Sequence, residues 1–211
     1  MTAIISCTDV SRTYGSGRDA VVAIHGVTCE VREGDKIAVV GSSGSGKTTL
    51  LHLLSGLDGP TTGEIHRYDA PVGIVFQGPS LLPPLDVTEN VALPLLIAGC
   101  DGGEAEDRAR EALRQVGLAG LGKRLPEELS GGQAQRVAVA RVLAAAPRLI
   151  IADEPTGQLD SAHADEIISL LLGVADDLEA GLVIATHDPA IAERLPYRWE
   201  MCDGTLGRQT C

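Results

Sequence analysis

The chain has 211 residues, a formal net charge of −12, 44% hydrophobic residues and only 2% aromatic residues. This length suits one domain, or one domain with a small subdomain, and the scarcity of aromatic side chains requires an aliphatic core. An acidic surface repels nucleic-acid phosphates and anionic lipid headgroups, so we expect neither of them as the main ligand and no nucleic-acid partner.

Membrane spans, signal peptides and zinc sites are not expected either. No apolar run reaches the roughly 18–20 residues that a membrane span requires, and MTAIISCTDV at the start lacks a basic segment followed by a long apolar one. The cysteines are scattered, without a CxxC pair or a histidine at ligand spacing: Cys7, Cys29, Cys100, Cys202 and Cys211. Reduced thiols in a cytosolic protein are therefore expected.

The first part of the chain predicts strands that lead into a glycine-rich loop. β-Branched and apolar runs, punctuated by Gly and Pro, predict these elements in order: a strand at 20–31, a turn at 33–35, a strand at 36–40, a helix at 47–56 that ends at the Gly-Pro punctuation of 57–63, and strands at 64–68 and 72–76.

The rest of the chain predicts helices that alternate with apolar strands. The expected elements are a helical stretch over 86–116 with a Gly-rich break at 101–103, a helix at 133–146, a strand at 148–153, a helix at 161–180, a strand at 181–188 and a hairpin over 199–208. Asp86 or Thr88 is expected to cap the first helix, and Pro94 to kink or interrupt it. This alternation indicates an α/β core with a mostly parallel sheet.

A phosphate-binding loop is the clearest functional signal. GSSGSGKT (41–48) matches G-x-x-x-x-G-K-[ST], follows an apolar strand and opens a helix. Its glycines let several N–H groups face one anion, and the helix N-terminus adds partial positive charge. Lys47 is expected to bridge the terminal phosphates, and the Thr48 hydroxyl to bind Mg²⁺. The alternative, a Gly-Ser surface turn, is disfavoured because strand, Lys, Thr and helix all stand in register.

Two carboxylates supply a second part of a nucleotide site. In RLIIADE (148–154), Asp153 ends an apolar strand, where ligands collect in open α/β sheets. A carboxylate there can hold the Mg²⁺ shell, and Glu154 beside it is a candidate general base for water. An Asp-Glu step after a strand is more often a solvated turn or a helix cap, but the phosphate-binding loop upstream favours the site.

A second Ser-Gly-Gly step opens another predicted helix, in LSGGQAQRVAVAR (129–141). Ser130 and Gln133 fit a capping box, S-x-x-Q, which explains the Ser and the Gln. It does not explain Gly131 and Gly132, which weaken a helix start unless something must approach the backbone. A second anion site explains all four residues. Two chains placed head-to-tail would then sandwich each nucleotide between one chain's phosphate-binding loop and the other chain's Ser-Gly-Gly step.

At these residues the chain resembles the ATPases of ATP-binding cassette (ABC) transporters, over essentially its whole length. The matching pieces follow the family order: GSSGSGKTT (41–49), Gln77 in VFQ, LSGGQAQRVAVAR (129–141), LIIADEPTGQLD (149–160) and His187 in THD. The resemblance implies an ABC ATPase fold, in which a P-loop NTPase core with a mostly parallel sheet carries an antiparallel β subdomain and a helical subdomain. The core and its antiparallel part would span 1–85 and 147–211, and the helical subdomain about 86–146.

The resemblance also implies a role for each matching residue. The nucleotide-binding residues would be Tyr14, Gly41, Ser42, Ser43, Gly44, Ser45, Gly46, Lys47, Thr48, Thr49 and Gln77. Tyr14 would stack on adenine, the alternative being a packed tyrosine at a strand edge. Mg²⁺ would be held by Thr48, Gln77 and, through water, Asp153.

The remaining implied roles concern catalysis and the dimer. Lys47, Glu154 and His187 would be catalytic, with His187 contacting the γ-phosphate; a buried core histidine is the alternative for that residue. The signature residues Ser130, Gly131, Gly132 and Gln133 would act on the nucleotide of the opposite subunit. Asp160 would cross the dimer seam.

ATP and Mg²⁺ are thus the expected cofactors, and a second copy of the chain and an integral membrane permease the expected partners. The permease would dock around Gln77 and residues 78–100, including Leu81, Leu82 and Leu85, and would hold the chain at the cytoplasmic face of the cell membrane. The stretches 56–65, 77–99 and 153–160 resemble the lipoprotein-releasing and macrolide-efflux branch of the family.

Two departures and two alternatives accompany this interpretation. The interval from Gly63 to Gln77 is shorter than is usual in the family, and Gln158 stands where Asn or Ser is commoner. One alternative is a soluble ABC-type ATPase in DNA repair or translation, which the acidic balance and the lack of large insertions disfavour. The other is a monomeric P-loop kinase, which would not need LSGGQ.

Overall fold

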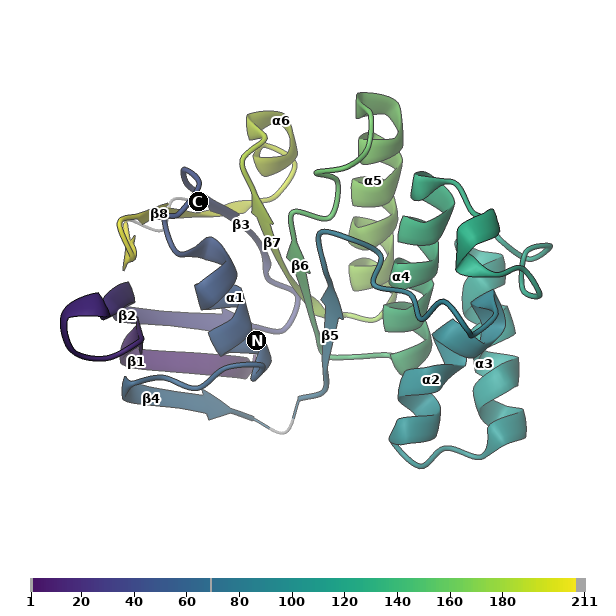
Figure 1. Ribbon diagram of the computed structural model, residues 1–211, viewed down its shortest axis with the longest axis horizontal. Helices are drawn as coiled ribbons and strands as arrows, with labels where there is room; N and C mark the ends of the chain where they lie inside the picture. The colour runs from purple at the N-terminus through teal and green to yellow at the C-terminus, as the bar shows by residue number, and fades with distance from the viewer. Residues whose placement is uncertain (1, 69, 208–211) are drawn as a thin grey trace.

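The computed structural model describes residues 2–68 and 70–207. Its strands are β1 (Ala3–Tyr14), β2 (Val21–Arg32), β3 (Lys36–Val40), β4 (Thr62–Arg67), β5 (Val72–Val75), β6 (Leu149–Asp153), β7 (Gly181–Thr186), β8 (Tyr197–Cys202) and β9 (Thr205–Leu206). Its α-helices are α1 (Lys47–Ser55), α2 (Val87–Ile97), α3 (Gly102–Gln115), α4 (Gly131–Ala145), α5 (Ser161–Asp177) and α6 (Pro189–Ala192). Short 3₁₀ turns lie at Gly17–Asp19 and Pro126–Glu128. Figure 1 shows β1, β2 and β4 on one side, with β8 above them, β3 and β5–β7 in the middle, and α2–α4 on the other side.

The central sheet brings the ends of five parallel strands to one edge. Its order is β5-β6-β7-β3-β8-β9, and only β9 pairs antiparallel, with β8. Strands β6 and β7 are apolar and buried almost throughout, as strands covered on both faces must be. Because Val40 pairs with Thr186 and Asp153 with Ala185, the segments that follow β3, β6 and β7 leave the sheet side by side.

The second sheet is antiparallel, in the order β2-β1-β4, and packs against α1. A continuous aliphatic cluster joins this sheet, α1 and the near face of the central sheet; it includes Ile4, Val10, Ile24, Leu50 and Val39. Trp199 on β8 is 2% exposed and completes that cluster. The predicted fold class, a mostly parallel α/β core with an antiparallel β part, is confirmed.

The helices α2, α3 and α4 surround a hydrophobic cluster of their own. Asp86 caps α2 through a capping box with Glu89, whereas the Thr88 hydroxyl donates to the Gly122 carbonyl oxygen at 3.0 Å. Asp86 is therefore the cap. Pro94 lies inside α2, which runs without interruption, so the predicted interruption is wrong: one missing N–H is tolerated because α3 and α4 pack against the helix.

The break between α2 and α3 lies at 98–101 and not at the predicted 101–103, because the glycines at 102 and 103 belong to α3. The Asp101 carboxylate accepts hydrogen bonds from the N–H groups of Gly103 and Glu104, at 2.9 and 3.4 Å, so α3 begins at Gly102. A well-placed cap outweighs the weak helix propensity of glycine. Helix α4 begins two residues before the predicted start, because Ser130 caps it.

Across residues 2–68 and 70–207, no helix combines the length and apolarity needed to cross a membrane. The cysteines at 7, 29, 100 and 202 are free thiols, while Cys211 and the last predicted hairpin residue, Arg208, lie outside the described residues.

Candidate nucleotide site

The loop between β3 and α1 is built around glycines that a side chain would disrupt. Gly44 and Gly46 have φ angles of 78° and 102°, in the left-handed region that favours glycine. A Cβ at Gly46 would also lie 2.7 Å from the Ala23 carbonyl oxygen, and one at Gly41 would lie 2.4 Å from the Met201 carbonyl oxygen. The loop therefore fits tightly against β2 and β8, which fixes where its N–H groups lie.

Lys47 and Ser45 hold this loop together from inside. The Lys47 ammonium donates to the carbonyl oxygens of Gly41 and Ser42, at 2.8 and 3.0 Å, although the residue is almost fully buried. The Ser45 N–H donates to the Ser42 carbonyl at 3.2 Å, and the Ser45 carbonyl accepts from the Gly204 N–H at 3.0 Å. The charged end of Lys47 is thus placed at the loop by the loop's own backbone.

A pocket of about 370 Å³ lies between this loop and the ends of β5 and β6; its lining comprises Ala23, Ser43, Gly44, Gly46, Lys47, Thr48, Thr49, Gln77, Asp153 and Glu154. Residues from four segments far apart in the sequence therefore converge on one space. Gly41, Ser42 and Ser45 shape the loop without lining the pocket. The carboxylates of Asp153 and Glu154 and the positive end of α1 give the pocket both signs of charge, which suits a polyphosphate with a bound cation.

Glu154 and His187 form a pair at this edge of the sheet. The Glu154 N–H donates to the Ala185 carbonyl oxygen at 3.0 Å, and its carboxylate oxygen lies 3.2 Å from Nδ1 of His187. Glu154 has φ of 42°, a conformation that costs a bulky residue about 1–3 kcal/mol and is typical of functional sites. His187 is exposed, so it is not a buried core histidine; it lines an adjoining pocket of about 320 Å³ together with Gly41.

The Ser-Gly-Gly step lies outside the pocket. Ser130 Oγ accepts from the Gln133 N–H at 3.2 Å, and Gln133 Oε1 accepts from the Ser130 N–H at 3.0 Å, which is the predicted capping box. A Cβ at Gly132 would lie 3.2 Å from the His163 ring, so a close approach to this backbone is already made within the chain. Of the described residues, none of the four signature residues lines the nucleotide pocket.

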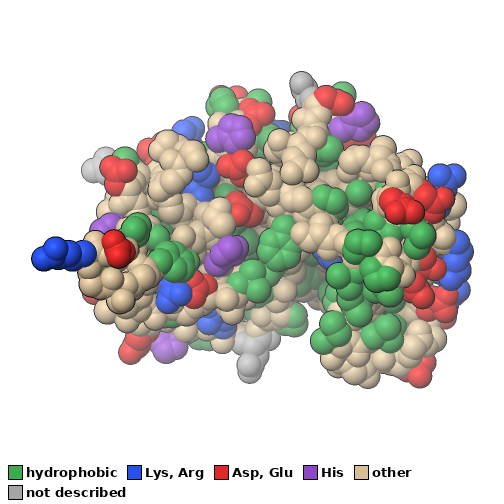
Figure 2. Space-filling view, in the orientation of Figure 1, with side chains coloured by type: hydrophobic (Ala, Val, Ile, Leu, Met, Phe, Trp, Pro, Cys, Tyr) green, Lys and Arg blue, Asp and Glu red, His purple; other side chains and the backbone are tan. Residues whose placement is uncertain are grey.

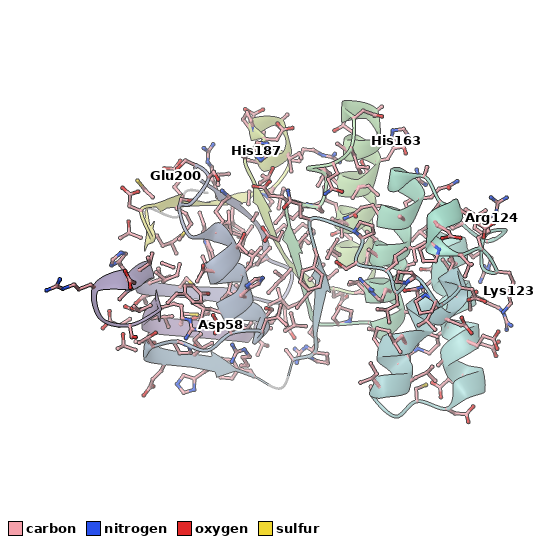
Figure 3. The ribbon with its side chains drawn as sticks, viewed as in Figure 1. Asp58, Lys123, Arg124, His163, His187 and Glu200 are labelled. Atoms are coloured by element: carbon pink, nitrogen blue, oxygen red, sulfur yellow. The ribbon has the colours of Figure 1, made fainter. Side chains whose placement is uncertain are left out.

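Asp160 caps α5 and pairs with the same histidine. Its carboxylate accepts from the His163 N–H at 3.1 Å, and the Nδ1 atom of His163 lies 2.8 Å from one of its oxygens. The backbone hydrogen bond from His163, followed by the contact with its ring, lowers the pKa of Asp160 below its ordinary value. Figure 3 shows His163 and His187 at the same edge of the molecule.

Comparison with known proteins places this geometry in a family. The family model described as "ABC transporter" matches residues 24–157, which is more than half of the chain. The chain belongs to the ABC transporter family. As an ATP-binding cassette of that family it is an ATP hydrolase. The alternative of a monomeric P-loop kinase is therefore wrong.

Solved structures of ABC cassettes are similar over nearly the whole chain. A dimeric structure of the bacterial ABC transporter cassette MJ0796 is 35% identical, with a TM-score of 0.87 over 98% of this chain and 97% of that one. The same cassette in a dimeric post-hydrolysis state bound to ADP and Pi is 34% identical, with the same TM-score and coverage. CbiO1 of Clostridium perfringens, part of the ABC transporter complex cbiONQ, is 29% identical, with a TM-score of 0.86 over 99% and 88% of the two chains.

In this ABC cassette Tyr14 stands at the end of β1, opposite Val21, and is 39% exposed. Its hydroxyl donates to the Asp58 carboxylate at 2.8 Å, and the Arg12 guanidinium lies over its ring, 4.6 Å from the centroid. Tyr14 does not line the pocket itself. Its role toward adenine stays a prediction.

Several functional contacts of the cassette could not be foreseen from sequence. Gln77 follows β5, and its side-chain amide lies against the loop after Glu154, 3.2 Å from the Cβ position of Gly157. Two polar residues of α4 hold the loop that contains Gln77. Gln135 donates to the Phe76 carbonyl at 3.3 Å, while Arg141 donates to the carbonyls of Ser80 and Pro79 at 3.1 and 3.2 Å. The helix that begins at the signature step therefore also supports the Gln77 loop.

Proposed function

We propose that this chain is the ATP-hydrolysing subunit of an ABC transporter that dimerises head-to-tail on ATP and drives an integral membrane permease at the cytoplasmic face of the membrane. One observation carries the proposal. The pocket holds the phosphate-binding loop and both acids, but the signature step lies elsewhere on the surface, at the exposed start of α4. A second copy related by a two-fold axis would bring its own signature step over this pocket. The same symmetry would place the first copy's signature step over the second copy's pocket, so two sites would be completed at once.

The start of α4 suits the role of a phosphate contact in trans. Ser130 and Gly131 are exposed, and the helix has 15 residues whose aligned dipoles leave positive charge at this end. The N–H groups of the first turn that the capping box leaves free would face the partner's γ-phosphate, with Ser130, Gly131 and Gly132 closing over it and Gln133 in support. Asp160, the residue that caps α5, would lie at the seam between the protomers.

Within each site, the chain's own residues divide the work of hydrolysis. Lys47 would neutralise the terminal phosphates, and Glu154 would orient and polarise the attacking water. His187 lies 3.2 Å from Glu154 and would contact the γ-phosphate while keeping that carboxylate in place. The neutralisation of charge on the phosphates would be the chief catalytic effect, because phosphoryl transfer needs little covalent assistance.

The donor set of the pocket fits Mg²⁺. Thr48, Gln77 and Asp153 bring a hydroxyl, an amide and a carboxylate to one pocket, and Mg²⁺ binds such oxygen ligands through one or two protein groups together with phosphates and water. Thr48 and Gln77 would bind it directly and Asp153 through water. When bound, Mg²⁺ would offset the negative charge on the phosphates.

The dimer is tested by Glu154→Gln, which removes the base but leaves both binding surfaces intact. In gel filtration with ATP and Mg²⁺ this variant should elute as a stable dimer, because turnover no longer releases the nucleotide that joins the protomers. Lys47→Ala serves as the control, since it should stay monomeric under the same conditions. Protein concentration must be matched, because dimerisation follows mass action. A Glu154→Gln variant that remains monomeric at every concentration would rule out the sandwich.

The surface beside the Gln77 loop is proposed as the permease contact. Figure 2 shows hydrophobic side chains gathered over α2 and the loop before it. Leu82, Leu96 and Ile97 are 44%, 45% and 78% exposed there, whereas Leu81 packs against the helical cluster and Leu85 is half-buried. CbiO1, a similar protein, is part of a transporter complex, which supports a membrane partner.

Replacing Leu82 and Leu85 with Asp should abolish stimulation of hydrolysis by the permease and leave ATP binding unchanged. Leu57→Asp, on an exposed leucine far from this surface, is the matched control. Stimulation that survives the double change would show that the permease docks elsewhere.

Co-purification would test the remaining alternative, a soluble ABC-type ATPase in DNA repair or translation. Co-purification of a membrane protein with a large extracytoplasmic domain would support the lipoprotein-releasing and macrolide-efflux branch, whereas co-purification of nucleic acid would favour the soluble ATPase.

A further inference from the structure

A closed triangle of side chains surrounds Tyr14. Its hydroxyl donates to Oδ2 of Asp58 at 2.8 Å, Nη2 of Arg12 lies 2.8 Å from Oδ1 of the same carboxylate, and the Arg12 guanidinium lies 4.6 Å from the Tyr14 ring centroid. Each of the three residues therefore contacts the other two. Figure 3 shows Asp58 on the side of the antiparallel sheet, away from the labelled histidines.

The triangle is anchored to the helix that carries the phosphate-binding loop. Asp58 follows α1 by three residues, and its N–H donates to the carbonyl oxygen of His52 in that helix at 3.2 Å. The other end of α1 is Lys47. Since a nine-residue helix is a rigid rod of about 13 Å, the phosphate end and the tyrosine are held at a fixed separation.

Tyr14 stays accessible although Arg12 packs on it. The Arg12 guanidinium lies over the ring, yet the residue as a whole is 39% exposed, so part of Tyr14 can still be reached by a ligand. Arg12 Nε is buried and, among the described residues, has no hydrogen-bond partner. Its position is set by the carboxylate that it pairs with and by the ring that it lies over.

We propose that Asp58 and Arg12 are positioning residues that hold the Tyr14 ring ready to receive the base of the bound nucleotide on the face opposite Arg12. This inference rests on the proposed role of Tyr14 in stacking on adenine. A ring whose two torsions are already fixed loses little entropy when the base stacks on it, so Asp58 and Arg12 raise the affinity for the base without touching the base themselves. Asp58 and Arg12 act through Tyr14 alone and contribute nothing at the phosphate end.

The test compares the dissociation constants of ATP and of inorganic triphosphate, both with Mg²⁺, by calorimetry on the full chain. Asp58→Ala should weaken ATP binding by about three- to tenfold, the worth of one lost hydrogen bond, and change triphosphate binding less than about twofold. Tyr14→Phe, which keeps the ring and loses the hydroxyl, should reproduce the ATP effect. Glu64→Ala is the matched control, on strand β4, which pairs with the strand β1 that carries Tyr14. This change should alter neither dissociation constant.

A double variant separates the possible failures. In a Tyr14→Ala background, Asp58→Ala should add no further loss of ATP affinity, because the residue it acts through is absent. Equal weakening of ATP and triphosphate by Asp58→Ala would overturn the inference, since the effect would then reach the phosphate end through α1. Full ATP affinity in Tyr14→Ala alone would instead refute the stacking role of Tyr14, and the inference with it, while leaving the phosphate site intact.

Discussion

Replacing Gly46 with alanine tests whether the phosphate-binding loop depends on close contact with β2. Gly46 has φ of 102°, and a Cβ there would lie 2.7 Å from the Ala23 carbonyl oxygen. Gly44, with φ of 78°, has no atom within 4 Å of its Cβ position. Both substitutions carry the left-handed cost of about 1–2 kcal/mol. Only Gly46→Ala adds overlap with a backbone atom, which costs a further 1–3 kcal/mol or so.

Gly44→Ala should therefore lower the free energy of unfolding by about 1–2 kcal/mol and Gly46→Ala by about 2–5 kcal/mol. Both values are measured by urea denaturation without nucleotide. Unfolding is monitored by the fluorescence of Trp199, the single tryptophan, which is 2% exposed. Equal losses, within about 0.5 kcal/mol, would show that the contact with Ala23 imposes no constraint on the loop.

Three further changes address catalysis, the loop before α2 and pH. His187→Ala should lower ATP turnover at least about tenfold, because Glu154 loses its neighbour and the γ-phosphate loses a contact; unchanged turnover in a steady-state assay would contradict this. Asn90, 1% exposed, bonds four backbone groups of that loop, so Asn90→Ala should cost about 2–4 kcal/mol in urea denaturation, and a loss below about 1 kcal/mol would be inconsistent with those bonds. The pKa of Asp58 is lowered from its ordinary 3.8, chiefly by the hydrogen bond from Tyr14. Its contacts are therefore complete above that value and lost only as pH falls through the lowered pKa, so the ATP affinity ratio between wild type and Asp58→Asn should not vary from about pH 8 to about pH 5; a ratio that changes in calorimetry over this range would contradict the assignment.

The sequence predicts those parts of the fold whose causes are local. The strands that become β3, β6 and β7 are short apolar runs, which parallel strands buried on both faces require. Because parallel strands end at one edge, the loop at 41–48 and the acids of 148–154 were expected to meet, and they line one pocket. Boundaries were less predictable, since the glycines at 102 and 103 become helical under the cap of Asp101.

The parts that sequence analysis missed depend on contacts between distant residues. Asp58 stands in LDGP, where it is indistinguishable from turn punctuation, yet it binds a tyrosine 44 positions away. Arg141 lies in a helix whose apolar spacing indicates only a packed face, and its guanidinium holds carbonyls about sixty positions upstream. Polar residues that act on backbone groups of another segment leave no periodic pattern, so only the folded chain reveals them.

The proposed mechanism requires that one copy of the chain lack a complete site and that ATP join two copies to make two. ATP turnover per protomer, measured against protein concentration beside sedimentation of the same samples, tests this directly. The rate per protomer should rise with concentration in proportion to the dimer fraction and vanish where only monomer sediments. A constant rate per protomer down to concentrations at which the chain is entirely monomeric would contradict the claim.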